Sequence, residues 1–552
     1  DDLVAQLNQD CTAETMCVMR SRVFGDREIS LFATALAKNT SLKTLLLNGH
    51  SISSAAATSF GIALGENKTL ENLTIGDNDF GDVALEALID GGLQQNSTIR
   101  SVDLEYRSLG PSSSVKMGEL MRLGKLPLKH LLLSRNNLLG EAESFGQLLE
   151  GIQSHQYLEV LDLASNSKAL TSSESLDPLL GASLASQLMK LHGQSTLKQL
   201  LFQDNKFGPT AGEPLARLIA NGLPQLTTLN VGHCELGDDG VVAMSEAIPS
   251  AVCLTNLDVS SNNLTVVGAT ALSQAMNAPE SHITSLSLAS NNLGDDGAMA
   301  LVSPLNTSAR SLTKLDVSRN GLTSVGVVAL LEASGTDSCC GNIAELVLLG
   351  NTLKDEGVSE LASTLSKKAK EISSVPLALL DLTGVQMTNN SLHVLLDAVE
   401  EIKSIKSLIL GGNNVGSSWK EIETFKTRTG IDVSFDQEQN KDDKEGTSGS
   451  NLAASASGTS GGGMEEGNAS VSNQAPPPKW IEHQPKQIES TVVDTSHLKL
   501  GDTVVIQRLA NAKKYNGMRG IVSSGLLNGR ISVWLEAEHK SIAVRPENLE
   551  SV

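Results

Sequence analysis

The stretch LTNLDVSSNNL at residues 254–264 decides the fold, because close copies of it return along the chain. Three of these copies are ITSLSLASNNL (283–293), LTKLDVSRNGL (312–322) and IAELVLLGNTL (343–353). All fit one pattern, Leu-x-x-Leu-x-Leu-x-x-Asn-x-Leu, with other aliphatic residues in some Leu positions. Such a fixed period, here about 29 residues, is typical of stacked units that bury their apolar faces only against their neighbours. The pattern therefore predicts a solenoid and favours a binding surface over a catalytic pocket.

Each unit is expected to form a strand, a turn and a helix. The strand portion alternates with period two, so Leu257 and Val259 should point into the core and Asp258 should point out. Asn262 follows the strand, where an amide side chain can bond backbone groups of adjacent units. The next segment, exemplified by LGDDGAMAL at 293–301, has helical spacing with Asp at the helix start.

The fold class that follows is α/β, a curved solenoid with parallel strands inside and helices outside. We align thirteen units, and their first Leu-type positions run from Leu42 to Ile405. The repeat domain is assigned to residues 1–435. A degenerate unit at 17–24, with Met19 and Phe24 in its later apolar positions, is expected to serve as an N-terminal cap within residues 1–24. Because a helix is wider than a strand, the stack must curve.

The sequence resembles a known family. Its period and the phrase Asn-x-Leu-Gly-Asp-Asp-Gly-x-x-x-Leu at 291–301 resemble the ribonuclease-inhibitor-type leucine-rich repeats. Repeats of this type occur in ribonuclease inhibitor, in the sensing arm of NOD-like receptors and in the Ran GTPase-activating protein. The resemblance covers about residues 17–435 and implies the solenoid fold. It leaves the partner open, because members of the family bind unrelated proteins.

The outward strand positions of the inner, concave face are the candidate partner-binding site. The central outward position is Asp in five of the thirteen units: Asp103, Asp162, Asp258, Asp316 and Asp381. We interpret these as an acidic stripe for a basic protein partner; the alternative is that they only keep the sheet surface soluble. Neighbouring positions carry a few side chains suited to anchor a partner, namely Tyr106, His130, Arg135, His233 and Arg319.

Composition and motifs argue against a catalytic function. The net charge is −21, most of it within residues 1–435, which disfavours nucleic acid and anionic membrane as partners. Phosphate-loop, zinc-protease and nucleophile-elbow motifs are lacking, and the ten histidines have no metal-ligand spacing, so no cofactor or metal is expected. The prediction is a non-catalytic protein-interaction scaffold. The alternative is an activator of a small GTPase, of the Ran GTPase-activating type.

The chain beyond the repeats divides in two. Residues 436–495 are polar and rich in Gly and Ser, which predicts a disordered linker. Residues 496–552 contain four or five short β-rich runs and resemble KOW-type, SH3-like small barrels. We expect the barrel to bind peptide or protein; RNA binding and a purely stabilising role are the alternatives. Its candidate surface residues are Arg508, Lys513, Lys514, Tyr515 and Arg519.

Several smaller features complete the expectations. The six cysteines have no metal spacing and suit a reduced, cytoplasmic and also nuclear setting; Cys234 stands where other units place Asn. Several Asn-x-Ser/Thr triplets, at Asn39, Asn67, Asn96 and Asn306, are explained by chance in so Asn- and Ser-rich a repeat.

The long spacer 167–195 predicts an extra convex helix rather than a docking helix. No apolar run is long enough to span a membrane, a removed leader stays open because the chain starts with Asp, and a monomer is expected.

Overall fold

The computed structural model describes residues 2–8, 14–22, 24–167, 178–302, 312–332, 343–371 and 375–436 of the repeat array. Towards the C-terminus it describes 503–506, 518–522, 531–535, 540–544 and 549–551. The expected linker lies outside the described residues, apart from Asp436. The two parts are therefore described separately.

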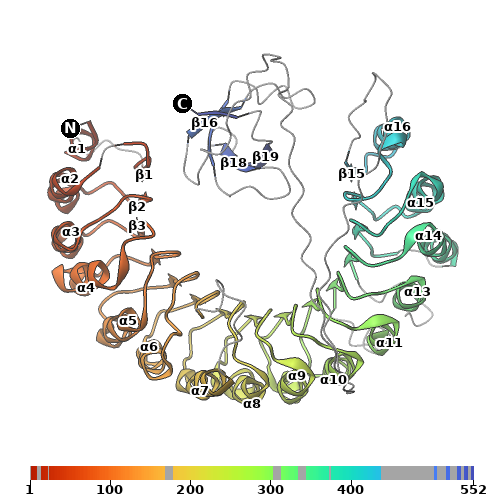
Figure 1. Cartoon of the computed structure of the whole chain (residues 1–552), viewed down its shortest axis with the longest axis horizontal. Helices are drawn as coiled ribbons and strands as arrows, with labels where there is room; N and C mark the ends of the chain where they lie inside the picture. Colours follow the sequence, from red (N-terminus) through yellow and green to blue (C-terminus); the bar gives the residue numbers. More distant parts are fainter. Residues whose placement is uncertain are drawn as a thin grey trace, which may run out of the picture.

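The repeat array is built on one parallel sheet of fifteen strands, hydrogen-bonded in sequence order from β1 to β15. The strands line the inside of an arc and the helices its outside (Figure 1). The strands are β1 (Thr15–Cys17), β2 (Thr44–Asn48), β3 (Asn72–Gly76), β4 (Ser101–Asp103), β5 (His130–Leu132), β6 (Val160–Asp162), β7 (Gln199–Leu201), β8 (Thr228–Asn230), β9 (Asn256–Asp258), β10 (Ser285–Ser287), β11 (Lys314–Asp316), β12 (Glu345–Val347), β13 (Leu379–Asp381), β14 (Ser407–Ile409) and β15 (Asp432–Ser434). The predicted curved α/β solenoid is confirmed.

A helix follows almost every strand and returns the chain along the outer side of the arc (Figure 1). The α-helices of the described residues are α1 (Asp2–Asn8), α2 (Asp26–Lys38), α3 (Ser54–Glu66), α4 (Gly81–Gly91), α5 (Pro111–Leu123), α6 (Ala142–Ser154), α7 (Pro178–Gln187), α8 (Gly212–Arg217), α9 (Gly237–Ser245), α10 (Val266–Met276), α11 (Gly294–Ala300), α13 (Ser324–Glu332), α14 (Lys354–Glu371), α15 (Asn389–Glu401) and α16 (Trp419–Thr429). Short 3-10 or π turns extend several of them. The buried aliphatic residues of all units form one continuous core.

The alternation of each strand decides which side chains enter that core. In β9 and the residue after it, Leu257 and Val259 are buried, whereas Asn256 is exposed and Asp258 is half-buried. Neighbouring strands keep the same register, because Leu257 pairs with Leu229 on one side and Leu286 on the other. The period-two prediction is confirmed.

The predicted asparagine ladder links most turns to the unit before it; the exceptions are Asn78, which is exposed and makes no such bond among the described residues, and Val385, which takes the equivalent position. The Asn262 side-chain amide donates to the carbonyl of Val231, the residue that directly follows the preceding strand, over 2.8 Å. The equivalent amides of Asn136, Asn166, Asn205, Asn291, Asn320, Asn351 and Asn413 donate to the corresponding carbonyl of their preceding units. Cys234 substitutes as predicted, since its buried Sγ lies 3.2 Å from the carbonyl oxygen of Phe202. Burial raises the pKa of this thiol, so it stays protonated.

Two other residues also make the ladder contact and were not predicted from the sequence. His50 is buried with its Nε2 3.0 Å from the carbonyl oxygen of Val18, and burial lowers the pKa of His50. Arg107 is 7% exposed, and its Nε donates to the carbonyl of Ile75 over 2.6 Å. In each case the carbonyl belongs to the residue at the end of the preceding unit's strand segment, which is the carbonyl that the asparagine side chain contacts in other units. A histidine and an arginine therefore fill a position built for asparagine.

Paired acids at helix starts also join neighbouring units. Asp238 accepts bonds from the backbone N–H of Thr265 (2.9 Å), from its hydroxyl (2.6 Å) and from the N–H of Gly268 (2.9 Å). Asp295 and Asp355 make equivalent bonds to Thr323 and Thr388. These carboxylates satisfy the open N–H groups at the start of the next helix. Their role is structural, as expected from their sequence position.

Glycines allow three pairs of outer helices to approach closely, one of them α8 and α9, where a Cβ added at Gly212 would lie 2.3 Å from the carbonyl oxygen of Gly240. A Cβ added at Gly151 of α6 would lie 2.1 Å from the carbonyl oxygen of Gly118 in α5. A Cβ added at Gly61 of α3 would lie 2.4 Å from the carbonyl oxygen of Leu88 in α4. Because the atoms in the way are backbone, no side-chain rearrangement could make room.

An ion-pair row precedes the strands of the middle units. Glu159 bridges Lys129 and Lys198, with O···N distances of 2.7 and 2.9 Å. The hydrogen bond from Lys129, and then that from Lys198, lower the pKa of Glu159 from 4.5 to about 2. The carboxylate therefore stabilises the folded state in its ionised form.

We expect Glu159→Gln to lower the free energy of unfolding by about 1 kcal/mol at pH 7, because the two lysine side chains are 40% and 47% exposed and water screens the pairs. The stabilisation is fully present above the unfolded-state pKa and is lost as the pH falls towards about 2. Urea unfolding at a series of pH values should therefore show the wild-type advantage shrinking below pH 4.5. Glu246→Gln, at an exposed acid that makes no ion pair with any described residue, is the control and should show no such trend.

Some expectations for the array need correction. The degenerate first unit has its strand at Thr15–Cys17, and Met16 and Val18 fill its buried positions; Met19 takes the outward place of Asn48. A further strand, β15, follows the thirteen aligned units. The spacer 167–195 does supply a convex element, α7, whose Leu184 is buried, although Leu179 remains 77% exposed. The triplet residues Asn39, Asn67 and Asn96 are buried and hydrogen-bonded to backbone, which excludes them as glycan acceptors in the folded chain; Asn306 lies outside the described residues.

A second, separate sheet is described near the C-terminus. It has five antiparallel strands in the order β19-β18-β17-β16-β20. They are β16 (Thr503–Ile506), β17 (Arg519–Val522), β18 (Ile531–Leu535), β19 (Lys540–Val544) and β20 (Leu549–Ser551). Val504, Ile506 and Val533 are buried in it. The short strands agree with the predicted β-rich runs, and closure into an SH3-like barrel stays a prediction.

Candidate protein-binding surface

The central outward positions form one continuous row along the concave face, which we call the central row. Register pairs Asp103 with Leu132, Leu132 with Asp162, and so on to Ile409 and Ser434. The row contains the five predicted aspartates, separated by aliphatic or small polar residues. All five aspartates are half-buried. The structure therefore places them in one row, but not next to one another.

Each aspartate of the central row also holds the turn that follows its strand. Asp258 Oδ1 accepts the backbone N–H of Ser260 over 2.9 Å. Asp103, Asp162, Asp316 and Asp381 accept the N–H two residues further on in the same way, at 2.8 to 3.0 Å. Asn230 makes the same bond to Gly232, so the position requires an acceptor rather than a charge. This turn bond is a role that neither sequence interpretation included.

The charges of the row nevertheless remain available to a partner. In each aspartate the turn bond ends on Oδ1. The Thr74 hydroxyl donates to Oδ2 of Asp103 over 3.4 Å, whereas no hydrogen bond within the described residues reaches Oδ2 of the other four. At Asp162, burial raises the pKa of the carboxyl group, and the nearby Asp103 raises it further. A cationic side chain approaching this place would relieve an existing electrostatic cost.

Four of the five predicted anchors share a second row. Tyr106, Arg135, His233 and Arg319 all lie three residues after a central-row residue, at the turn beyond the strand. Their φ angles are 57°, 58°, 54° and 51°, in the left-handed region. We call the set of residues at this turn position the left-handed row; its other members are Gly49, Ser165, Asp204, Ser261, Ser290, Gly350, Gly384 and Gly412. The fifth anchor, His130, instead opens strand β5.

Backbone hydrogen bonds hold the left-handed row in place. The N–H of Tyr106 donates to Ser134, that of Arg135 to Ala164 and that of Arg319 to Leu349, each a carbonyl of the next unit, over 2.7 to 3.0 Å. A residue with a side chain in this conformation is strained by about 1 kcal/mol or more, and glycine is not. The array uses glycine here in four units. Large side chains at the others are therefore tolerated at a cost.

The anchors differ in how free their side chains are. Arg135 lies 3.5 Å from Glu105, and His233 Nδ1 lies 2.8 Å from Oδ1 of Asp204. The Tyr106 side chain is 54% exposed. Arg319 is exposed, and none of the ion pairs among the described residues of the array involves it. Tyr106 and Arg319 are thus the anchors most open to a partner, and Asp204 is a member of the surface that the sequence did not indicate.

Only one of the five candidate surface residues of the C-terminal module lies within the described residues. Arg519, at the start of β17, is exposed. Arg508, Lys513, Lys514 and Tyr515 lie outside the described residues. Their role as a second binding surface therefore stays a prediction.

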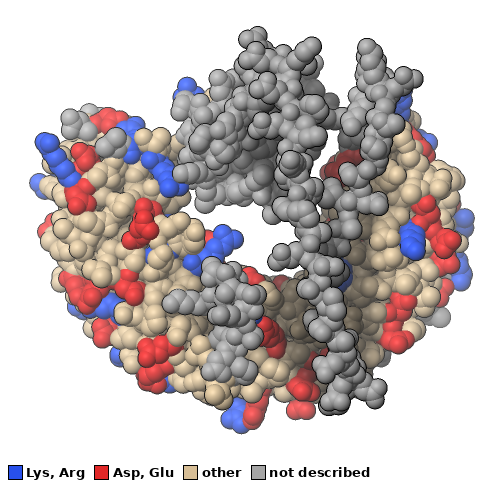
Figure 2. Space-filling view, in the orientation of Figure 1, with Lys and Arg blue, Asp and Glu red and all other residues tan. Residues whose placement is uncertain are grey.

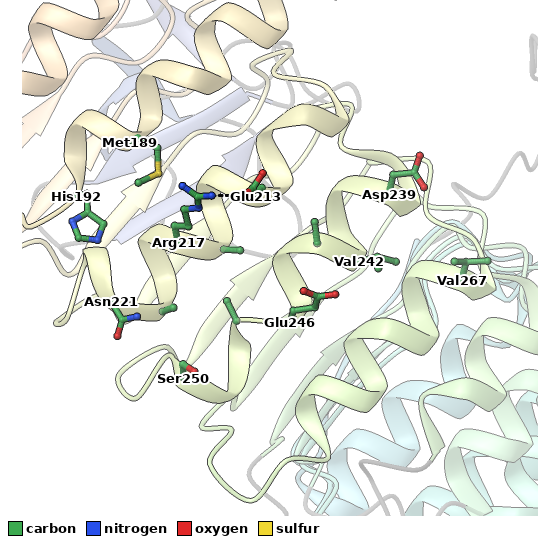
Figure 3. Close-up of a pocket in the computed structure, with 14 residues that line it drawn as sticks. Met189, His192, Glu213, Arg217, Asn221, Asp239, Val242, Glu246, Ser250 and Val267 are labelled. Atoms are coloured by element: carbon green, nitrogen blue, oxygen red, sulfur yellow. Dashed lines mark hydrogen bonds and ion pairs between the residues drawn. The ribbon is translucent and has the colours of Figure 1, made fainter.

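The outer, convex face carries charges of both signs along its edge (Figure 2). It also carries a groove of about 1030 Å³ between the helices that follow β7 and β8 (Figure 3). One wall is α8 with the π turn at Leu218–Gly222, and the other is α9. Nothing in the repeat pattern predicted this groove.

The described residues were also searched for metal clusters and for membrane-spanning helices. No cluster of three or more His, Cys, Asp or Glu side chains among them could hold a metal ion. Within the same residues, no helix combines the length and apolarity that a bilayer crossing requires.

Comparison with known proteins shows what the repeat array is similar to. Residues 66–88, 223–245, 251–273, 281–302 and 308–331 match the family described as Leucine Rich repeat. The repeats of the array are similar to those of ribonuclease inhibitor. The Sus scrofa ribonuclease inhibitor is 26% identical over 428 residues, covering 75% of this chain and 80% of that protein. The Mus musculus ribonuclease inhibitor is 25% identical over 412 residues, covering 73% and 78%.

Other similarities are more partial. The Mus musculus Tonsoku-like protein is 26% identical over 237 residues, covering 41% of this chain and 16% of that protein. Among solved structures, an internalin (InlF) from Listeria monocytogenes overlaps 63% of this chain and 83% of that chain, with 14% identity and a TM-score of 0.35. Neither adds to the assignment of function.

Proposed function

We propose that this chain is a non-catalytic, intracellular scaffold that binds a protein partner on the concave face of its repeat array. The observation that carries the proposal is the register of the sheet, which sets the central row and the left-handed row side by side along the arc. The relatives over most of the chain are named as inhibitors of ribonuclease, a protein target. The partner is a protein with basic side chains for the central row and a surface that receives Tyr106 and Arg319.

The left-handed row supports the location. Residues with strained backbone angles persist only where the surrounding structure holds them in that conformation, and they are concentrated at functional sites. Arg319 could be glycine without loss of fold, since Gly350 occupies the same position one unit on. Its side chain is exposed, and its guanidinium is an always charged group that can bind a carboxylate through two hydrogen bonds. Tyr106 adds apolar area of the kind that dominates interface energies.

The C-terminal sheet is proposed as an accessory module that binds peptide or protein. The arrangement of domains, repeat array to residue 435, linker to 495 and barrel to 552, is part of the same proposal. It would let one partner on the array and another on the barrel be held on a single chain, at an effective concentration set by the linker.

A site-specific cross-link tests the concave face. A photoreactive phenylalanine derivative at Tyr106 in the full chain should give a covalent adduct with the bound protein in cell extract. The same residue at Tyr157, which is 48% exposed but lies before β6 rather than on the left-handed row, should give little. Equal adducts from both positions would contradict a concave interface. Faster GTP hydrolysis by a captured GTPase on addition of the chain would contradict a non-catalytic role.

Arg319→Gly separates binding from stability. We expect it to raise the free energy of unfolding by up to about 1 kcal/mol, because the strain of a left-handed arginine is removed. It should weaken capture of the partner about tenfold or more, as expected for an interface arginine. Thermal unfolding and quantitative capture are measured on the same preparations. A variant that is both less stable and less bound would show that Arg319 acts through the fold.

A further inference from the structure

The convex groove between α8 and α9 is the strongest feature that the concave interface does not use. Along α9, Asp239, Val242, Ala243 and Glu246 fall at helical spacing and face the groove (Figure 3). The opposite wall offers Ala216 and Ala220 from α8 and its π turn. Small apolar side chains thus form the floor, and charged groups stand at its edges.

The electrostatics of the groove are acidic. Its one arginine, Arg217, is paired with Glu213 on the same helix and is thereby neutralised (Figure 3). Asp239 and Glu246 are exposed, and no ion pair or hydrogen bond within the described part of the array engages either carboxylate. The other basic residue of the lining is His192, at the end of the groove near Met189. The free charge on the groove is therefore negative.

The walls also restrict what can bind. Both are helices, whose backbone groups bond internally, so the groove offers no sheet edge to which an extended peptide could add a strand. An occupant buried against alanine and valine side chains must satisfy its own backbone hydrogen bonds. A helix satisfies its backbone hydrogen bonds internally. Because alanine side chains are small, the apolar face of a bound helix can approach the floor of the groove closely.

We propose that this groove docks a short amphipathic helix of a second protein, with apolar residues at i, i+3, i+4 and i+7 and lysine or arginine on its flanks. The cations would pair with Asp239 and Glu246, and the apolar face would cover Ala216, Ala220, Val242 and Ala243. The site lies on the opposite side of the repeats from the central row (Figures 1 and 3). A partner on the concave face and one in the groove can therefore be bound at once.

The probe is a fluorescein-labelled helical peptide with leucines at i, i+3, i+4 and i+7 and lysines on both flanks, titrated with the full chain while its fluorescence anisotropy is followed. We expect saturable binding that weakens about tenfold in the double variant Asp239→Lys with Glu246→Lys. The matched control is Asp296→Lys with Glu356→Lys. It makes the same charge change at exposed residues of other helix starts, away from the groove.

A second variant tests the floor. Ala243→Trp fills the groove without changing its charge and should also weaken the peptide about tenfold, whereas Arg319→Gly on the concave face should leave its affinity unchanged. Equal weakening by both charge-reversed pairs would show diffuse attraction to an acidic chain and would overturn the proposal. So would tight binding of a proline-interrupted peptide of the same composition, or no binding of the helical peptide at all. Circular dichroism of each variant confirms that the array is folded.

Discussion

Replacing Gly151 by alanine should lower the free energy of unfolding of the repeat array by about 3 kcal/mol. The added methyl group would lie 2.1 Å from the carbonyl oxygen and 2.6 Å from the Cα of Gly118, and both are backbone atoms of a packed helix. Alanine is the better helix former by up to about 1 kcal/mol, which offsets only part of this cost. Helices α5 and α6 would have to separate, and the strain would extend to the units on either side.

Urea unfolding measures the loss, and hydrogen exchange locates it. Amides of α5 and α6 should lose protection first, because a repeat array responds locally to a weakened interface. Gly411→Ala is the control, since its nearest neighbour is a methyl carbon at 3.9 Å and equivalent turn positions hold Ala164 and Ala289. We expect that control to change stability by less than about 0.5 kcal/mol. A Gly151→Ala variant as stable as the wild type would show that the helices can move apart freely.

Replacing Arg107 by alanine should cost a similar amount, about 3 kcal/mol, for an electrostatic reason. The guanidinium donates to the carbonyls of Ile75, Glu105 and Tyr106, and it is almost fully buried. Burial lowers the pKa of Arg107, while the nearby Asp103, Asp77 and Glu105 oppose that shift. Alanine would leave buried carbonyls without donors and the acidic groups without their cation.

Arg107→Asn is the informative companion variant. In the next unit, the Asn136 amide donates to Leu104, Leu133 and Ser134, which include the counterparts of Ile75 and Glu105. Asparagine at 107 should therefore recover at least half of the stability lost in Arg107→Ala, as measured by urea unfolding. An asparagine variant as unstable as alanine would mean that the positive charge, rather than the ladder bonds, is what this unit needs.

The fold could be predicted from the sequence because period-two alternation predicts a half-buried strand, and the regular spacing between units predicts that these strands stack in parallel. Leu257 and Val259 could be assigned to the core from alternation alone. The central-row aspartates could be located, yet their turn bonds could not, since the alternation says nothing of the backbone beyond the strand. Arg107 was missed because a charged residue gives no sign that it will replace an amide inside the ladder.

The two candidate binding surfaces, the concave face and the convex groove, were likewise only partly predictable from the sequence. Tyr106, Arg135, His233 and Arg319 were chosen by residue type, and only the backbone angles show that they occupy equivalent turns. The groove could not be foreseen, because it arises from small side chains at Ala216 and Ala243 and from the π turn after α8, none of which alters the apolar pattern. Both depend on local backbone geometry, which a repeating sequence leaves unspecified.

The glycines between the outer helices have a consequence for shape as well as stability. Strands on the inside of the array are spaced about 4.8 Å apart, whereas packed helices are usually about 8 to 10 Å apart, and this mismatch bends the stack. Where Gly61, Gly118 and Gly151 bring helices closer, the outer spacing falls towards the inner one and the radius of curvature grows. The stack should therefore be flatter beside each glycine contact, including that of Gly212 with Gly240, than where bulkier side chains separate the helices. The inner surface that a partner must fit therefore depends in part on glycines on the opposite, outer side of the array.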